Sequence, residues 1–357
     1  MPPQTGWFDP TQNGGALRFA ANSYLPAKGD PAVRLPGLRR GDLVTLENGR
    51  VTAVNGGSPE RAGERPQFAD LGAVHPSRPL FLEAAGASSP RTGDIQRVVD
   101  LICPFGFGQR ALIVSPPKAG KTVMLQAVAE GVVLNHPDAT LLVLLVDERP
   151  EEVSEMVDWG KGEVIASSFD LPHERHVAVA DMVFERARRL VEEGKDAVIV
   201  LDSLTRLARS HNTTGRSSHR TLSGGLDANA MAKPKALFGA ARAVPSGGSL
   251  TVIATALVET DSRMDDVIFE EFKGTGNAEL RLSRELADRR IYPAVDIAAS
   301  GTRREELLAD AATVEGRQKL RRGLVSLPPE QAMQSLLEQV KRSKSNAELL
   351  KVAASRQ

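Results

Sequence analysis

The sequence SPPKAGKT, residues 115–122, is expected to form a loop between a strand and a helix. The apolar run ALIV leads into the loop, and Gly120-Lys121-Thr122 precede an apolar helical stretch. In this context the N–H groups that begin the helix point at bound phosphate, and the helix dipole favours negative charge. Lys121 would contact the outer phosphates, and the Thr122 hydroxyl would ligate Mg²⁺. Ser115 replaces the usual first glycine. A chance surface turn is the alternative, but the flanking strand and helix favour a nucleotide site.

Acidic side chains end two of the expected buried strands. Asp202 follows the apolar run DAVIVL, and Asp147 and Glu148 end the run TLLVLLVDE. The carboxyl ends of parallel strands meet at one edge of a sheet, where ligands bind. Asp202 would then hold Mg²⁺, and Glu148 would polarise or deprotonate the water that attacks the nucleotide. Alternatively these acids only cap strands at the surface, but their place beside a phosphate loop favours the catalytic interpretation.

A basic, glycine-rich segment extends over residues 206–242. Its only acidic residue is Asp227, and its basic residues are Arg206, Arg209, Arg216, Arg220, Lys233, Lys235 and Arg242. The run 212–230 is too long for a tight connection, and long loops in such domains are usually functional. Nucleic-acid backbone binding is one interpretation of this segment, and a solvated loop is the other. A second loop, FKGTGN, offers Lys273 in the same way.

Two arginine pairs follow late in the chain. Arg289-Arg290 precede Tyr292, and Arg303-Arg304 follow a Gly-Thr pair. Tyr292 could stack on a purine, although a half-buried core tyrosine is the commoner case. Arg303 could act as an arginine finger on nucleotide held by a neighbouring subunit, although a surface salt bridge is the simpler interpretation.

The composition is that of an ordinary globular protein. The chain has 357 residues, 41% of them hydrophobic, and a formal net charge of zero. No global field therefore attracts it to nucleic acid, so any such contact must come from a local patch. We expect the one cysteine, Cys103, to be a buried small hydrophobe in a reducing cytoplasm. No apolar run is long enough for a membrane span, and no secretory signal is evident.

Three segments differ in their patterns. Residues 1–66 contain short apolar pieces between glycine turns, which predicts a small β-rich domain. Residues 67–100 are a linker and connector, with an exposed loop expected at 88–94. Residues 101–357 read as an α/β domain with a parallel sheet and a helical tail. The expected strands are 111–114, 140–146, 163–168, 196–201 and 249–257. The expected helices are 121–134, 150–158, 175–193, 230–243, 330–343 and 346–354.

Several long motifs together resemble the bacterial transcription termination factor Rho family, over nearly all of residues 67–357. The matching runs are PFGFGQRALIVSPPKAGKT (104–122), LLVDERPEEVSEM (144–156), LDSLTRLARSHN (201–212), SGGLDANAMAKPKALFGAARAV (223–244), GGSLTVIATALVETDSRMDDVIFEEFKGTGNAELRLSR (247–284) and RRIYPAVDIAASGTRREELL (289–308). The resemblance implies a homo-hexameric ring of RecA-like P-loop ATPase domains. Such a ring holds ATP and Mg²⁺ between subunits, pulls single-stranded RNA through its pore and unwinds RNA–DNA hybrids. RNA polymerase is a further candidate partner.

The resemblance also implies a role for each matching residue. The phosphate loop would comprise Pro117, Lys118, Ala119, Gly120, Lys121, Thr122 and Val123. Lys121 would also act in catalysis with the base Glu148, its supporting Arg149 and the finger Arg303. Thr122 and Asp202 would hold the metal, Tyr292 would stack on adenine, and Arg290 would sense phosphate. Two pore loops, at 212–227 and 273–276, would contact RNA through Arg220, Thr221, Ser223, Gly224, Lys273 and Gly274.

The N-terminal region, residues 1–66, departs from the family pattern. Relatives usually carry a small helical domain and then an OB or cold-shock-like barrel that grips RNA with aromatic residues. We expect the helical domain to be absent here, and Gly14-Gly15-Ala16 stand where aromatics are expected, so the resemblance implies a degenerate barrel. We expect weak RNA binding by residues 1–66. The alternative is a relocated stacking surface made of Trp7, Phe8, Phe19 and Tyr24, although these four more simply close the small domain's core.

Two other functions compete with an RNA translocase. A rotary synthase subunit or a DNA recombinase would share the fold, but the runs DANAMAKPKALFGAARAV and FKGTGN match Rho instead. A paralogue could bind RNA or co-assemble with another Rho as a regulator, without terminating transcription itself. The intact phosphate loop with Glu148, Asp202 and Arg303 argues against an inactive ATPase, but not against a specialised one.

Overall fold

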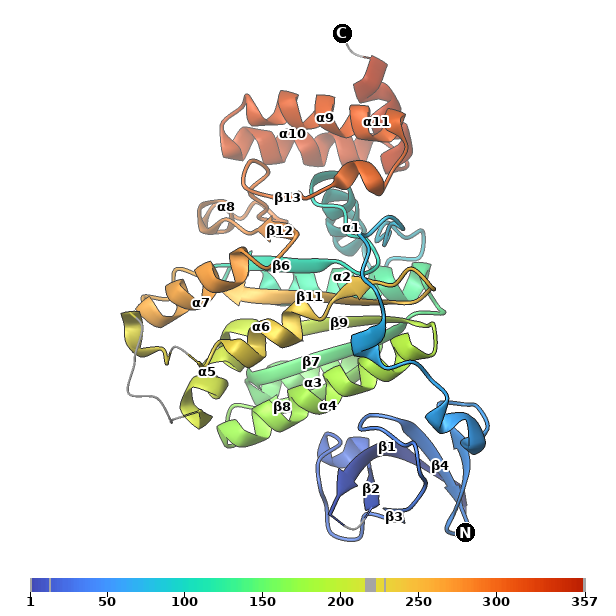
Figure 1. The fold of residues 1–357 in the computed structure, drawn as a ribbon. Helices are drawn as coiled ribbons and strands as arrows, with labels where there is room; N and C mark the ends of the chain where they lie inside the picture. Colours follow the sequence, from blue (N-terminus) through green and yellow to red (C-terminus); the bar gives the residue numbers. More distant parts are fainter. Residues whose placement is uncertain (1, 13, 216–222, 228, 356–357) are drawn as a thin grey trace.

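The computed structural model describes residues 2–12, 14–215, 223–227 and 229–355. Figure 1 shows three parts stacked along the molecule: a small β-sheet domain at the N-terminus, a central α/β domain and a group of C-terminal helices. The expected α/β class, with a β-rich domain before it and a helical tail after it, is confirmed. Among the described residues, no helix is long and apolar enough to cross a membrane.

The N-terminal sheet is antiparallel and curled, in the manner of an OB domain. Its strands follow the order β3-β2-β1-β4-β5. They are β1 (Gln4–Thr11), β2 (Gly14–Arg18), β3 (Ala32–Val33), β4 (Leu43–Glu47) and β5 (Arg50–Val54). Asn48 and Gly49 both have positive φ (48° and 78°), which makes the tight turn between β4 and β5. Phe8, Leu17 and Val44 fill the core of this sheet.

The central sheet is mostly parallel, with the strand order β13-β12-β6-β11-β9-β7-β8. Its strands are β6 (Arg110–Ser115), β7 (Thr140–Glu148), β8 (Glu163–Ser168), β9 (Asp196–Asp202), β10 (Arg242–Ala243), β11 (Ser249–Leu257), β12 (Ala278–Arg281) and β13 (Gly301–Thr302). The five strands expected from apolar runs are all confirmed. The sequence missed β10, β12 and β13, which are short. β10 and β13 pair antiparallel with their neighbours.

Helices cover both faces of this sheet, so alternate residues of each strand enter different cores. Leu112 and Val114 pack with helices on one face, and Ala111 and Ile113 pack with those on the other. The helices are α2 (Lys121–Asn135), α3 (Pro150–Trp159), α4 (His173–Glu192), α5 (Leu204–Thr214), α6 (Ala232–Gly239), α7 (Arg263–Lys273) and α8 (Arg284–Asp288). The helix expected at 230–243 is shorter, because the chain extends into β10 at Arg242 to pair with β11.

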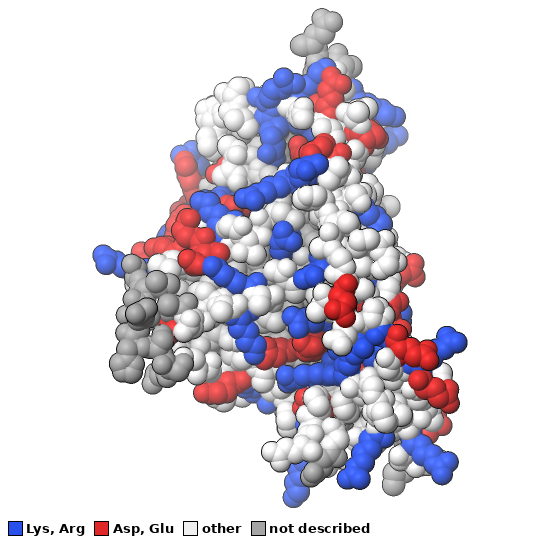
Figure 2. Space-filling model, in the orientation of Figure 1, with Lys and Arg blue, Asp and Glu red and all other residues white. Residues whose placement is uncertain are grey.

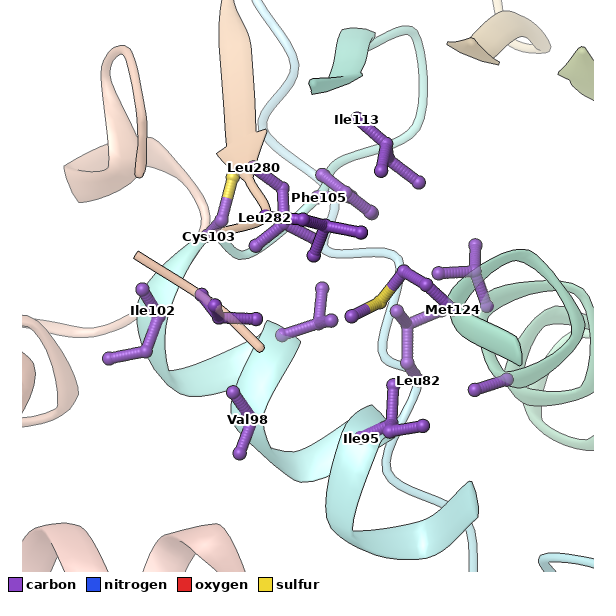
Figure 3. Close-up of a cluster of buried hydrophobic side chains, with 14 of the residues drawn as sticks. Leu82, Ile95, Val98, Ile102, Cys103, Phe105, Ile113, Met124, Leu280 and Leu282 are labelled. Atoms are coloured by element: carbon purple, nitrogen blue, oxygen red, sulfur yellow. The ribbon is translucent and has the colours of Figure 1, made fainter. Parts of the chain in front are cut away.

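The prediction of an exposed loop at 88–94 is wrong from Pro90 onward. Helix α1 (Pro90–Ile102) begins there, because the Ser89 side chain accepts a hydrogen bond from the Thr92 N–H and proline favours a first helical turn. Its apolar side faces the central domain, where Ile95 and Val98 belong to the same buried cluster as Met124 of α2 (Figure 3). Cys103, just after the helix, is fully buried as expected.

The C-terminal part contains three helices. They are α9 (Ala311–Val325), α10 (Pro329–Arg342) and α11 (Asn346–Ser355), and α10 and α11 match the expected tail helices closely. Leu320, Met333 and Leu336 bury their side chains among these helices and against α1. Arg97 of α1 donates to the carbonyl of Val340 at 2.6 Å, which fixes the end of α10.

The N-terminal domain packs on the edge of the central sheet at β8. Trp7 and Tyr24 stack with ring centroids 3.5 Å apart, and both rings join the apolar core of the central domain. The Tyr24 hydroxyl hydrogen-bonds the Glu163 carboxylate, and Ser23 Oγ donates to the Ala166 carbonyl at 2.7 Å. Two of the four front-end aromatics therefore hold the domains together, which favours a packing role for them over a stacking surface for RNA.

Candidate active site

The phosphate loop forms one wall of a cavity of about 640 Å³. The loop connects β6 to α2, and Gly120 takes φ +92° immediately before the helix begins at Lys121. This left-handed conformation suits glycine and turns the first N–H groups of α2 toward the cavity. Pro117, Lys118, Thr122 and Val123 also line it. Ala119, which also belongs to the loop, is buried.

Lys121 lies between two buried carboxylates. Its Nζ donates to Glu148 Oε1 and to Asp202 Oδ1, at 2.7 Å in each case. Burial lowers the pKa of Lys121, but the two carboxylates outweigh it and raise that pKa above its ordinary value. Burial raises the pKa of Asp202, although Lys121 opposes the shift. The Thr255 hydroxyl donates to the same Asp202 oxygen at 2.7 Å.

A bulge in β7 explains how two consecutive acids serve different partners. The pairing register between β7 and β8 shifts between Val146 and Glu148, and Asp147 takes φ +58°. Because of the bulge, Glu148 is buried beside Lys121, whereas Asp147 faces α4 and α5. The sequence pattern placed both acids at the strand end but could not show this division.

Arg206 connects the two acids. Its Nε lies 3.4 Å from Glu148 Oε1, and its Nη1 lies 3.6 Å from Asp147 Oδ2. His176 lies 3.8 Å from the other oxygen of Asp147, and its Nδ1 is 2.7 Å from Ser167 Oγ. Burial lowers the pKa of His176, so its ring is neutral near pH 7. No sequence pattern pointed to His176. Arg206 stood out only as part of a basic segment, although it lies in the first turn of α5, directly after the strand that ends at Asp202.

Thr122 and Asp202 also face a common small space of about 10 Å³ beside Glu148. A hydroxyl and a carboxylate are the oxygen ligands that Mg²⁺ prefers, so these two residues fit the role expected of them. Among the described residues, no group of three His, Cys, Asp or Glu side chains could hold a metal by itself. Arg149 caps α3 with an exposed side chain at the cavity mouth, 3.7 Å from Glu152.

Tyr292 lies against the phosphate loop. A side-chain carbon placed on Gly120 would come within 3.7 Å of its ring, and the ring lines a small space with Val123. Arg91 lies over the same ring at 5.2 Å. Arg290 is exposed and does not line the cavity, so the structure does not bring it to the phosphates.

Arg303 lies at the amino ends of the central strands, which form the opposite edge of the sheet from the carboxyl ends where the phosphate loop lies. Its N–H donates to the Asn277 carbonyl at the start of β12, and β12 runs parallel to β6. The loop follows the other end of β6, which has six residues and so spans roughly 17 Å. The exposed Arg303 side chain therefore cannot reach its own chain's cavity, as expected of a residue that acts on a neighbour.

The two loops expected to contact RNA both adjoin α7. Gly224 packs on the start of α7, where an added side-chain carbon would lie 2.8 Å from the Met264 nitrogen. Lys273 ends α7 with an exposed side chain 3.4 Å from Glu270, and Gly274 follows it. Ser223 begins a short 3₁₀ turn. Arg220 and Thr221 lie outside the described residues.

Comparison with known proteins places this site in a family. Residues 96–302 match the nucleotide-binding domain of the ATP synthase alpha/beta family. The transcription termination factor Rho of Streptosporangium roseum is 50% identical over 97% of this chain and 90% of its own length. The chain belongs to the Rho family. The Rho of Streptomyces coelicolor is 52% identical and 83% covered.

The Rho of Gemmatimonas aurantiaca is 58% identical, but this chain spans only 49% of its length. Two solved structures share the fold with 21% identity each. They are an ATPase from the type III secretion system of pathogenic bacteria (TM-score 0.64, covering 79% of this chain and 85% of that chain) and EscN of enteropathogenic E. coli (0.63, covering 82% and 74%). The Rho resemblance drawn from the motifs is thereby confirmed.

Proposed function

We propose that this chain is a subunit of a ring-shaped ATPase that moves single-stranded RNA through its centre and thereby terminates transcription. The observation that carries the proposal is Lys121 between Glu148 and Asp202 in the phosphate-loop cavity, with Arg303 at the opposite sheet edge. A site whose arginine lies at the far edge needs a second subunit to complete it. A closed ring of identical subunits supplies one at every site.

In this proposal each residue has one task in ATP hydrolysis. Lys121 moves from the two carboxylates to the outer phosphates, while N–H groups of the loop bind the rest of the triphosphate. Thr122 and Asp202 would hold Mg²⁺, which would neutralise phosphate charge. Glu148, released from Lys121, orients the attacking water and accepts its proton. Arg149 supports Glu148, and Arg303 of the next subunit stabilises charge on the transferred phosphoryl group.

The remaining assignments concern nucleotide and RNA recognition. Tyr292 lies where an adenine could stack above the phosphate loop, and Arg290 is a weaker candidate because its exposed side chain does not line the cavity. The segment around Gly224 and the loop at Lys273 and Gly274 would contact RNA, together with Arg220, Thr221 and Ser223. Their support is that both described loops adjoin α7, and that the relatives are named as Rho. RNA polymerase would be a partner of the whole assembly.

ATP hydrolysis by the purified chain, with and without poly(C), poly(U) and structured RNA, tests this function. We expect RNA to stimulate hydrolysis, and Lys121→Ala, Glu148→Ala and Arg303→Ala each to abolish it. Mixing Lys121→Ala subunits with Arg303→Ala subunits should restore some activity, because some interfaces then combine two intact halves. A chain that binds nucleotide but never hydrolyses it would refute the enzyme. Hydrolysis without RNA–DNA strand displacement would indicate a regulatory paralogue instead.

A further inference from the structure

Three arginines lie together at the edge of the central sheet opposite the phosphate loop. Arg110 begins β6, Arg242 begins β10 beside the start of β11, and Arg303 follows β13. Asn277 joins two of them, because its side-chain oxygen accepts from the Arg110 N–H at 2.8 Å and its carbonyl accepts from the Arg303 N–H at 2.9 Å. We call these three residues the arginine edge. In Figure 2 Lys and Arg side chains recur across the centre of the displayed face.

No carboxylate of the described chain pairs with any member of the arginine edge. Arg110 donates instead to the carbonyls of Thr275 and Ala241, at 2.9 and 3.0 Å. Arg242 donates to a carbonyl in its own turn and lies 4.8 Å from the centre of the Phe68 ring. Burial lowers the pKa of Arg110, and Arg242 and Arg303 lower it further. Gathered like charges with no counter-ion favour an anionic partner from outside the chain.

The opposite edge of the same sheet offers negative charge. Helix α3 begins at the carboxyl end of β7, directly after Glu148 and Arg149, and its first turn lines the mouth of the nucleotide cavity. Glu151, Glu155 and Asp158 are exposed on α3. Their spacing of four and three residues places them on one side of the helix. We call these three residues the acidic stripe.

The strand order places the two surfaces in register between neighbouring subunits. If Arg303 reaches the phosphates of the next subunit, the amino edge of one sheet must face the carboxyl edge of the next. Arg303 lies beside β12, whereas the neighbour's Lys121, Glu148 and Asp202 meet above β6, β7 and β9. Arg110 and Arg242 lie further along the same edge, toward β8, so they would lie over whatever follows β7. That element is α3.

We propose that the arginine edge of one subunit docks on the acidic stripe of a second copy of this chain, and so sets the distance of Arg303 from the bound nucleotide. The inference rests on the proposed ring and names its contact surface. Such head-to-tail contacts use two different surfaces of one chain, and they close into a ring when the rotation between neighbouring copies closes. RNA would also suit three arginines. A protein partner is favoured because Arg303 must face a neighbour and because the chain itself presents matching acids.

Charge exchange within one chain tests this docking. Arg242→Glu and the double change Glu155→Lys with Asp158→Lys should each raise the protein concentration needed for half-assembly, by roughly tenfold for about 1.4 kcal/mol of lost attraction. Combining all three changes in one chain should recover most of the loss, because every interface contains both surfaces. Arg34→Glu, an exposed arginine of the N-terminal domain, is the matched control and should change nothing.

Assembly is measured by sedimentation velocity with nucleotide present, and the affinity of the phosphate loop for nucleotide reports that each variant is folded. If the wild-type chain forms no ring, both the proposed function and this docking fail. If rings form but neither charge reversal weakens them, only the docking fails. If Arg242→Glu weakens RNA binding and leaves assembly unchanged, the arginine edge binds RNA and the docking is refuted. The docking is supported if each charge reversal weakens assembly and the combined variant recovers it.

Discussion

The ammonium of Lys121 donates a hydrogen bond to the Glu148 carboxylate at 2.7 Å. The residue that binds phosphate is therefore tied to the residue proposed to activate water. Asp202 shares the same ammonium at the same distance. Bound triphosphate would compete for Lys121, and Glu148 would then lose its nearest cation. Nucleotide binding itself would in this way free the base.

Removal of the lysine separates stability from catalysis. Lys121→Met leaves Asp202 buried without its cation and Glu148 with only Arg206, at 3.4 Å, so we expect the free energy of unfolding at pH 7 to fall by roughly 3 kcal/mol. Glu148→Gln keeps the pair between Lys121 and Asp202, so it should cost less while lowering turnover at least a hundredfold. Urea unfolding of both variants, beside nucleotide affinity and turnover, checks this. If Lys121→Met and Glu148→Gln destabilised the protein equally, Lys121 would not be the residue that holds the two carboxylates together.

Arg206 is the cation that stays near Glu148 after Lys121 moves. At 3.4 Å from the carboxylate it can fix the orientation of the base. Arg206→Gln should lower kcat about tenfold or more, as expected for a lost charged contact, with KM nearly unchanged. Arg206→Lys should recover part of the loss. Arg209→Gln is the comparison, because Arg209 also lines the cavity but pairs with Asp265, at 2.5 Å, rather than with Glu148. A raised KM with normal kcat would assign Arg206 to nucleotide binding.

Acid should destabilise the protein through buried His211. Burial, and to a lesser extent the charge of Lys233, lower its pKa to about 4, while Asp181 opposes the shift. The unfolded chain binds this proton near pH 6.5, so the contribution to stability is complete above that pH. It is lost as the pH falls toward 4.

The thermal midpoint should therefore decrease between pH 7 and pH 5, and His211→Gln should flatten that decrease. His75→Gln, at an exposed position, should leave the slope as it is. An unchanged slope in His211→Gln would show that other groups, His176 among them, carry the acid sensitivity.

The sequence was sufficient to predict the central strands, because continuous apolar runs of that length are typical of strands buried on both faces. The phosphate loop and both acids could also be predicted, because each is recognised from residues that are neighbours in the sequence. The sequence did not predict the bulge at Asp147, which depends on pairing between β7 and β8. Nor did it predict that Trp7 stacks on Tyr24 at a domain junction, or that His176 reaches Asp147 from another element. Those arrangements depend on contacts between residues distant in the chain.

Most aromatic rings of the N-terminal domain are not accessible for RNA binding. Trp7 and Tyr24 are buried against each other, with only 1% and 8% of their surfaces exposed, and Phe8 lies in the domain core. Phe19 is half-buried, so it is the one member of the four that keeps an accessible ring. Base stacking on an aromatic contributes ~1–3 kcal/mol per base, and its loss would weaken binding by roughly fivefold or more.

We expect Phe19→Ala in the full chain to change the affinity for a short pyrimidine RNA by less than about threefold, because a stacking role would cost more. Lys273→Ala should weaken the same binding and flatten its salt dependence, because a phosphate contact is lost. Fluorescence anisotropy of labelled RNA at several salt concentrations measures both. The full chain is required, because an isolated N-terminal domain would expose Trp7 and Tyr24, which the central domain covers. Loss of RNA binding in Phe19→Ala, with assembly intact, would restore an aromatic RNA site at the front of the chain.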